Sequence, residues 1–238
     1  MTYEGILSYG HDEGDKMKKF RFIGFYDYTV ILTYISFASA VTGMFCAVSM
    51  RLRWAVVALA FSGLCDMFDG KIARTKKNRT EDEKSFGIQI DSLCDLVCFG
   101  ALPIVICYRL GMDRIYGMAL LTLYGLAGLI RLGYFNVVEA KRQAQTQEER
   151  KYYQGLPITS MAIVLPIFFA ASPLIPSHPA RMAVLHVLVG LVGFAFVLDF
   201  KFRKFSVKEA FLLAALVGVA VAVVVFAWHG WGRALRFH

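Results

Sequence analysis

Residues 88–108 read IQIDSLCDLVCFGALPIVICY, an apolar run of membrane-spanning length that holds two aspartates. About 20 apolar residues in a helix cross the ~30 Å hydrocarbon core of a bilayer. Other stretches also qualify, some with a few polar residues: 28–50, 54–74, 115–138, 157–175, 182–199 and 209–228. Lipid offers no hydrogen-bond partners, and the runs show no ten-residue alternation. They are therefore predicted to be seven transmembrane helices.

The overall composition supports a membrane protein. Hydrophobic residues make up 57% of the 238 residues and charged residues 18%, and the mean hydropathy is +0.53. Soluble domains carry about 25% charged residues, so the composition argues against a disordered tail, a fibrous repeat and most soluble enzymes. The five cysteines all lie in or beside apolar runs, and we expect them to serve packing.

The net charge of +8 comes from cations that lie between the apolar runs. This placement is typical of cytoplasmic membrane loops, so no nucleic-acid partner is expected. With the N-terminus in the cytoplasm, the cytoplasmic side holds 18 Lys and Arg and the opposite side seven. The sequence predicts an integral protein, of the plasma or inner membrane if prokaryotic. Its N-terminus is expected inside, its C-terminus outside and its acidic segment at the cytoplasmic face.

Four aspartates lie at membrane depth. Asp66 and Asp69 end the second predicted helix, and Asp91 and Asp95 begin the third. An ionised carboxylate there costs several kcal/mol unless it is paired or binds a metal. Residues three or four apart share a helix face, and the short connection makes the two helices neighbours. The four carboxylates would then converge. Oxygen ligands of this kind select Mg²⁺, Mn²⁺ or Ca²⁺, and such a cluster can hold two ions.

Small residues accompany these acids. Gly70, Ala73 and Gly87 lie on or near the same face, where they leave room for a bulky ligand to approach the backbone. Arg74 follows one turn after Gly70, at a position where a guanidinium could bind a pyrophosphate at two points. In the alternative interpretations, Lys71 and Arg74 pair with helix-end acids, or the acids line an ion path. Neither alternative explains the small residues.

These residues together resemble the signature of the CDP-alcohol phosphotransferase family: Asp66-x2-Asp69-Gly70-x2-Ala73-Arg74…Gly87-x3-Asp91-x3-Asp95. Twelve residues, 75–86 (TKKNRTEDEKSF), separate the arginine from the second glycine, about four more than the family usually has. We interpret the difference as an insertion in a charged loop that leaves both helix ends intact.

The resemblance implies an all-α integral membrane fold with a six-transmembrane-helix core, in which the seventh predicted helix is an addition. It also implies a homodimer whose active site opens near the cytoplasmic face. Two divalent ions, Mg²⁺ or Mn²⁺, would be bound by the four aspartates Asp66, Asp69, Asp91 and Asp95, and Asp95 would also act as the general base. The CDP moiety would contact residues that match the family pattern, namely Gly70, Ala73, Arg74, Gly87 and, less closely, Thr33.

Three segments are similar to the branch of this family that contains the phosphatidylserine synthases: DSLCDLVCFGALP (91–103), RLGYFN (131–136) and YYQGLPIT (152–159). The second segment has Tyr134 where a second arginine is usual. The implied reaction transfers the phosphatidyl group of CDP-diacylglycerol to the hydroxyl of L-serine and releases CMP. The serine would be bound by the matching residues Arg131, Asn136, Gly155 and Pro157.

Arg131 has a physical reason to bind a substrate. A cation inside a membrane helix is costly, so it is expected to face a cavity and meet an anion such as the serine carboxylate. Alternatively, it pairs with one of the aspartates and holds helices together, or the acceptor is inositol phosphate or glycerol phosphate. A cation transporter with an aspartate relay is a more distant alternative, because the sequence shows none of the internal repeats usual in transporters.

Three regions follow from these predictions. Residues 1–27 form a cytoplasmic N-terminal segment, in which 16–27 (KMKKFRFIGFYD) either lies along the membrane interface as an amphipathic helix or only sets the topology. Residues 28–199 form the six-helix catalytic membrane domain. Residues 200–238 form a basic loop followed by the extra transmembrane helix.

Overall fold

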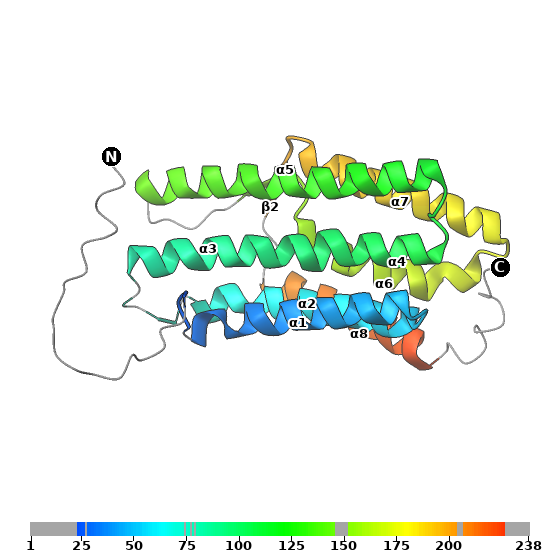
Figure 1. Ribbon diagram of the computed structural model, residues 1–238, viewed down its shortest axis with the longest axis horizontal. Helices are drawn as coiled ribbons and strands as arrows, with labels where there is room; N and C mark the ends of the chain where they lie inside the picture. The colour runs from blue at the N-terminus through cyan, green and yellow to red at the C-terminus, as the bar shows by residue number, and fades with distance from the viewer. Residues whose placement is uncertain are drawn as a thin grey trace.

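The apolar runs fold into long helices that lie side by side along the long axis of the molecule (Figure 1). The computed structural model describes residues 23–26, 28–73, 75–76, 78, 80–145, 152–203 and 207–226. Its α-helices are α1 (Tyr28–Val48), α2 (Leu52–Ala73), α3 (Glu81–Asp95), α4 (Leu102–Leu110), α5 (Ile115–Gln145), α6 (Met161–Ala171), α7 (His178–Val197) and α8 (Val207–Phe226). The predicted all-α class is confirmed. The proposed interfacial segment 16–27 lies outside the described residues except for 23–26.

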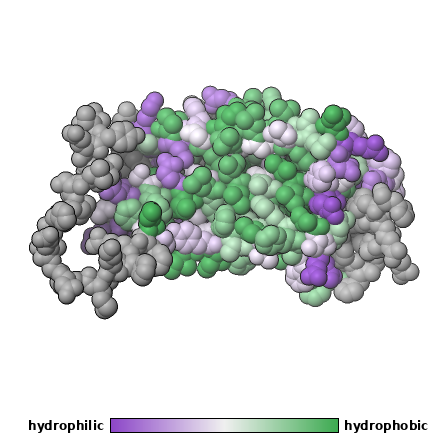
Figure 2. Space-filling model, in the orientation of Figure 1, coloured by the Kyte–Doolittle hydropathy of each residue, from purple (hydrophilic) through white to green (hydrophobic). Residues whose placement is uncertain are grey.

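The surface of the bundle fits a bilayer. Among the described residues, four helical stretches are long and apolar enough to cross a membrane: Tyr28–Val48, Glu81–Leu110, Ile115–Lys141 and His178–Val197. Two shorter apolar helices accompany them, Ile158–Leu174 and Phe211–Phe226. Figure 2 shows hydrophobic side chains across the middle of the molecule and hydrophilic ones toward both ends. These features identify an integral membrane protein.

Small residues bring the helices close together. A methyl group on Gly43 of α1 would lie 2.8 Å from Cβ of Ala58 in α2, and one on Gly63 of α2 would lie 2.6 Å from Cβ of Ala162 in α6. Helices in lipid gain little from the hydrophobic effect and associate through such close van der Waals contacts. The bundle therefore has little room for larger side chains at these crossings.

The third membrane segment is one rod made of three pieces (Figure 1). Between α3 and α4 lies a π-helical turn, η2 (Leu96–Ala101). Pro103 stands at the start of α4, and a proline in a helix both lacks an N–H and crowds the carbonyl four residues earlier. A widened turn relieves that crowding. The residue four before Pro103 is Phe99, inside η2.

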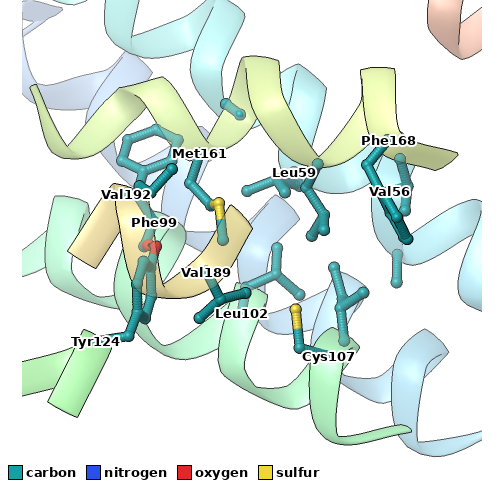
Figure 3. Packing of buried hydrophobic residues seen from close by; sticks show 14 of the residues in the cluster. Val56, Leu59, Phe99, Leu102, Cys107, Tyr124, Met161, Phe168, Val189 and Val192 are labelled. Carbon is teal, nitrogen blue, oxygen red and sulfur yellow. The ribbon is translucent and has the colours of Figure 1, made fainter. Parts of the chain in front are cut away.

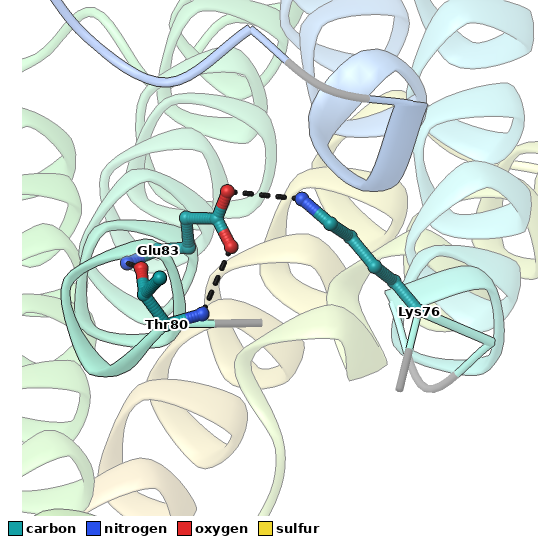
Figure 4. Close-up of polar contacts among 3 residues, drawn as sticks. All are labelled: Lys76, Thr80 and Glu83. Atoms are coloured by element: carbon teal, nitrogen blue, oxygen red, sulfur yellow. Dashed lines mark hydrogen bonds and ion pairs between the residues drawn. The ribbon is translucent and has the colours of Figure 1, made fainter. Parts of the chain in front are cut away.

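The start of α3 corrects the sequence interpretation. The charged stretch 75–86 is predicted to be loop, but α3 begins at Glu81. The Oγ1 of Thr80 accepts from the backbone N–H of Glu83 at 3.1 Å, and the Glu83 carboxylate accepts from the N–H of Thr80 at 2.9 Å. Lys76 also donates to Glu83 at 2.9 Å (Figure 4). These bonds satisfy the free N–H groups of the first turn, so the helix extends into the charged segment.

The remaining elements connect and cover the core. A pair of three-residue strands, β1 (Tyr152–Gln154) and β2 (Lys201–Arg203), joins the α5–α6 connection to the α7–α8 connection in antiparallel register. The 3₁₀ turns η3 (Ile158–Ser160) and η4 (Ser172–Leu174) flank α6. Helix α8, the predicted addition, packs against α6 and α2. Figure 3 shows part of the buried core, in which Leu59, Leu102 and Tyr124 are almost fully enclosed.

Candidate active site

Four carboxylates meet where the ends of α2 and α3 face each other. Asp66 and Asp69 lie in the second half of α2, and Asp91 and Asp95 in the second half of α3. The side chain of Asp66 lies close to that of Asp95, and the side chain of Asp69 lies close to that of Asp91. The lower-numbered residue of one helix thus meets the higher-numbered residue of the other, which is the register of two antiparallel helices.

Three of these acids form a tight group. One carboxylate oxygen from each of Asp66, Asp91 and Asp95 lies within 4.8 Å of the other two. Asp69 is buried beside Asp91, with a relative exposure of 9%. Oxygen donors at such separations can share a divalent cation, and their negative charges repel one another without one. The residues present therefore fit a divalent cation.

Open space lies beside the acids. In the part of the chain that the structure describes, and apart from its own helix, nothing lies within 4 Å of the position that a methyl group on Gly70 would occupy. Helix α2 packs against η2 and α4 more closely than against α3. Gly87 is half-buried, one turn before Asp91 on α3. Ala73 is the last residue of α2, while its side chain and the whole of Arg74 lie outside the described residues. The proposed CDP contacts of these residues stay predictions.

Small polar side chains of α1, α2, α3 and η2 form a buried layer next to Asp95. The Cys94 thiol donates to the backbone carbonyl of Thr33 at 3.3 Å, and Thr33 is 4% exposed. The Oγ of Ser36 lies 3.4 Å from the Cys98 sulfur, and the Oγ of Ser62 donates to the Ser36 carbonyl at 3.1 Å. Thr33 is predicted from the sequence as a CDP contact, but the other residues of this layer are not predicted there. The signal of the layer is the pair Cys94 and Cys98, four residues apart beside Asp95, together with polar residues in apolar runs.

Helix α5 carries Arg131 and Asn136. Arg131 is buried, with 8% of its surface exposed, although it is charged. The Oγ of Ser92, next to Asp91, donates to Oδ1 of Asn136 at 2.9 Å and so ties α3 to α5. Tyr134, at the position where the related branch has a second arginine, is 59% exposed. The arginine missing there is therefore not replaced by another inward-facing group at that position.

Gly155, on the connection between β1 and η3, lies against Arg131 of α5. A methyl group on Gly155 would lie 2.9 Å from Nη1 of Arg131 and 3.0 Å from the backbone oxygen of Leu198, just after α7. Gly155 has a φ of +67°, which favours glycine. Pro157, two residues later, is half-buried and directly precedes η3. The structure thus joins two of the four proposed acceptor residues, Arg131 and Gly155, and links Asn136 of α5 to α3 through Ser92.

Comparison with known proteins identifies the fold that carries this site. Residues 29–200 match the CDP-alcohol phosphatidyltransferase family. The chain is 38% identical over 106 residues to the CDP-diacylglycerol–serine O-phosphatidyltransferase of Saccharomyces cerevisiae, over 43% of this chain and 37% of that protein. It is 28% identical over 140 residues to the archaetidylserine synthase of Methanothermobacter thermautotrophicus, over 58% of this chain and 56% of that protein.

A longer alignment covers a third relative. The CDP-diacylglycerol–serine O-phosphatidyltransferase of Methanocaldococcus jannaschii is 25% identical over 194 residues, which is 82% of this chain and 83% of that protein. In the first two relatives the aligned part spans about half of the protein or less. The family match runs from the second residue of α1 to just beyond α7 and includes all four aspartates. The chain belongs to the CDP-alcohol phosphatidyltransferase family.

Proposed function

We propose that this protein transfers the phosphatidyl group of CDP-diacylglycerol to the hydroxyl of L-serine, which forms phosphatidylserine and releases CMP. The observation that carries the proposal is the group formed by Asp66, Asp91 and Asp95, whose oxygens lie within 4.8 Å of one another in a chain of this family. The names of the similar proteins favour serine as the acceptor, since two are serine O-phosphatidyltransferases and one is an archaetidylserine synthase.

Asp66, Asp69, Asp91 and Asp95 would hold two divalent ions, Mg²⁺ or Mn²⁺. When bound, such ions neutralise the charge of a pyrophosphate and stabilise the charge that develops on its oxygens during transfer. The support for this assignment is the donor set, which consists of carboxylate oxygens alone. It is also supported by the close approach of carboxylates on two different helices, which is unfavourable without a cation.

The Asp95 carboxylate is assigned the role of general base. As the serine hydroxyl oxygen attacks the phosphorus that carries diacylglycerol, its proton passes to Asp95. A bond forms between that oxygen and the phosphorus, and the bond from the phosphorus to the bridging oxygen of the pyrophosphate breaks. CMP leaves with the bridging oxygen and the electron pair of that bond. The nucleotide would occupy the open side of Gly70, beside Thr33, Ala73, Arg74 and Gly87.

Arg131 would bind the serine carboxylate. Its burial in a membrane helix and its place against Gly155 support this role, because a guanidinium binds a carboxylate through two parallel hydrogen bonds. The amide of Asn136, held through its oxygen by Ser92, would direct its N–H₂ group to the same substrate, and Gly155 and Pro157 would shape the wall. The alternative acceptors, inositol phosphate and glycerol phosphate, would also use a cation there.

The placement in the membrane follows the charge distribution. We propose a cytoplasmic N-terminus, an active site that opens to the cytoplasm and a C-terminus on the opposite side, since Lys and Arg concentrate in cytoplasmic loops. Residues 28–199 would form the catalytic domain and act as a homodimer. Residues 1–27 would form the cytoplasmic N-terminal segment, and residues 200–238 a basic loop with one added helix.

The test is CMP release by the purified protein in detergent with CDP-diacylglycerol and either Mg²⁺ or Mn²⁺. L-serine, inositol phosphate and glycerol 3-phosphate are added one at a time, and the protein carrying Asp66→Asn is the control. Release with serine alone is expected. Release with a phosphorylated acceptor alone would overturn the serine assignment and keep the chemistry. Absence of release, combined with cation flux in proteoliposomes, would favour a transporter over the enzyme.

A further inference from the structure

The turn that follows Asp95 has an unusual hydrogen-bonding problem. In an α-helix the carbonyl of Phe99 would accept from the N–H of residue 103, but residue 103 is proline and has no N–H. The N–H of Leu102 bonds instead to the carbonyl of Val97, five residues earlier, in the π-helical pattern of η2. Residue 103 therefore cannot supply the Phe99 carbonyl with its α-helical donor.

Tyr124 of α5 supplies that donor. Its hydroxyl donates to the Phe99 carbonyl at 2.5 Å, and both residues are almost fully buried. Figure 3 shows Tyr124 beside Phe99 in the core. The tyrosine is itself held in place, because its ring lies 5.5 Å from that of Phe196 and its backbone packs against Gly193 of α7. A rigid side chain on one helix thus completes the backbone of another.

The widened turn also sets the direction in which α3 faces. Side chains in four-residue steps along this rod all point toward α1, as three contacts show: Cys94 with Thr33, Cys98 with Ser36, and Leu102 with the position of a Gly43 methyl. In a regular α-helix each such step drifts by about 40°. The π turn compensates for this rotation. As a result, the side chains of α3 and α4 at these positions face α1 together.

Asp95 directly precedes this turn. If the turn shortened to an α-helical one, α3 would rotate by about 100° relative to α4. Because Leu102 and Ile106 are fully buried, α4 would keep its place and Asp95 would turn away from Asp66. Two hydrogen bonds join the rod to α5, one from Ser92 to Asn136 and one from Tyr124 to Phe99. Along the rod they flank Asp95, and along α5 they flank Arg131.

We propose that Tyr124 is a positioning residue for the reaction. Its hydroxyl, bonded to the Phe99 carbonyl that Pro103 deprives of its α-helical donor, holds the π turn in the register that directs Asp95 toward the acceptor. The inference deepens the proposed function and rests on the role of Asp95 as base there. Tyr124 itself does not touch the substrates.

The first test compares Tyr124→Phe with the wild type, with Tyr116→Phe as the matched control on the same helix. Tyr116 is 64% exposed and far along α5 from Arg131. CMP release is measured with each substrate varied in turn, and thermal unfolding is followed in the same detergent. Tyr124→Phe is expected to lower kcat about 10- to 100-fold, as small misplacements of reacting groups do, and to change the KM for CDP-diacylglycerol less than about threefold. The control is expected to match the wild type.

The second variant, Pro103→Ala with Tyr124→Phe, separates positioning from simple satisfaction of a carbonyl. The alanine brings an N–H to the Phe99 carbonyl in the α-helical register, so the melting temperature should recover toward that of the wild type while kcat stays low. Recovery of both quantities would show that Tyr124 only fills a hydrogen bond and would overturn the proposal. The proposal would also be overturned if the double variant had a melting temperature no higher than that of Tyr124→Phe. The same holds if Tyr124→Phe had the kcat of the wild type.

If Tyr124→Phe alone does not fold, the double variant is compared directly with the wild type. A melting temperature near that of the wild type together with a low kcat then supports the proposal, and recovery of both overturns it. Failure of the proposed function is a separate outcome: it is a wild-type protein that releases no CMP with any acceptor, whatever the variants do. In that case the thermal data still report whether Tyr124 and Pro103 act on the same carbonyl.

Discussion

The guanidinium of Arg131 lies against the backbone of Gly155, so closely that a methyl group on the glycine would be 2.9 Å from Nη1. The same methyl group would lie 3.0 Å from the Leu198 carbonyl oxygen. The contact connects the charged residue of α5 to the segment that leads into α6 and to the residue after α7. The direction of the arginine side chain therefore depends on a glycine that is distant in the sequence.

Gly155→Ala should displace the arginine and weaken serine binding. The new methyl group conflicts with the guanidinium, and φ of +67° is unfavourable for alanine by about 1–2 kcal/mol. We expect a higher KM for serine, a smaller change in the KM for CDP-diacylglycerol and a lower melting temperature. Serine titrations and thermal unfolding measure these effects. Gly218→Ala in α8 is the control, because nothing in the described part of the chain outside its own helix lies within 4 Å of the new methyl group. An unchanged serine KM in Gly155→Ala would argue against the contact.

Arg131→Lys should act on serine far more than on the lipid donor. Lysine keeps the charge but loses the two-point geometry with a carboxylate, so we expect the serine KM to rise about tenfold or more. Steady-state CMP release with each substrate varied gives the comparison. Arg114→Lys, exposed just before α5, is the matched control. Equal effects on both substrates would place Arg131 away from the acceptor.

Asp95→Asn should abolish turnover and largely spare binding of the lipid donor. The amide keeps the shape of the side chain but cannot take the serine proton, and the loss of a general base lowers rates about 10²- to 10⁴-fold. CMP release and direct binding of CDP-diacylglycerol are measured on the same preparation. Asp113→Asn, exposed in the turn before α5, is the control. A rate near that of the wild type would remove Asp95 from this role.

Metal binding can be measured without substrate. Electron paramagnetic resonance should detect tightly bound Mn²⁺ in the wild type, and a chelator should remove both this signal and the CMP release. Asp66→Asn or Asp91→Asn should weaken Mn²⁺ binding markedly, because each removes one oxygen from the group of three within 4.8 Å. The affinity of Asp113→Asn should equal that of the wild type. Unaltered Mn²⁺ binding after both changes in the group would rule out these carboxylates as ligands.

Much of the fold could be predicted because the signals are local. The length of each apolar run indicates a helix that crosses a bilayer, and the spacing of Asp66 with Asp69 and of Asp91 with Asp95 places each pair on one face. The start of α3 was also readable, because Thr80 and Glu83 have the spacing of a capping box. The charge of the segment concealed it, since charged residues between apolar runs suggest a loop.

The sequence alone determined the class of the fold, its membrane character and the convergence of four acids, since periodicity and hydrophobicity act over one or two turns of helix. Only the tertiary structure decided which carboxylates meet across the helices, how Arg131 rests on Gly155, and that Tyr124 completes the turn at Pro103. These contacts join residues distant in the chain. They depend on the rotation and depth of each helix, which are set by the packing of the whole bundle and not by the spacing within any one segment.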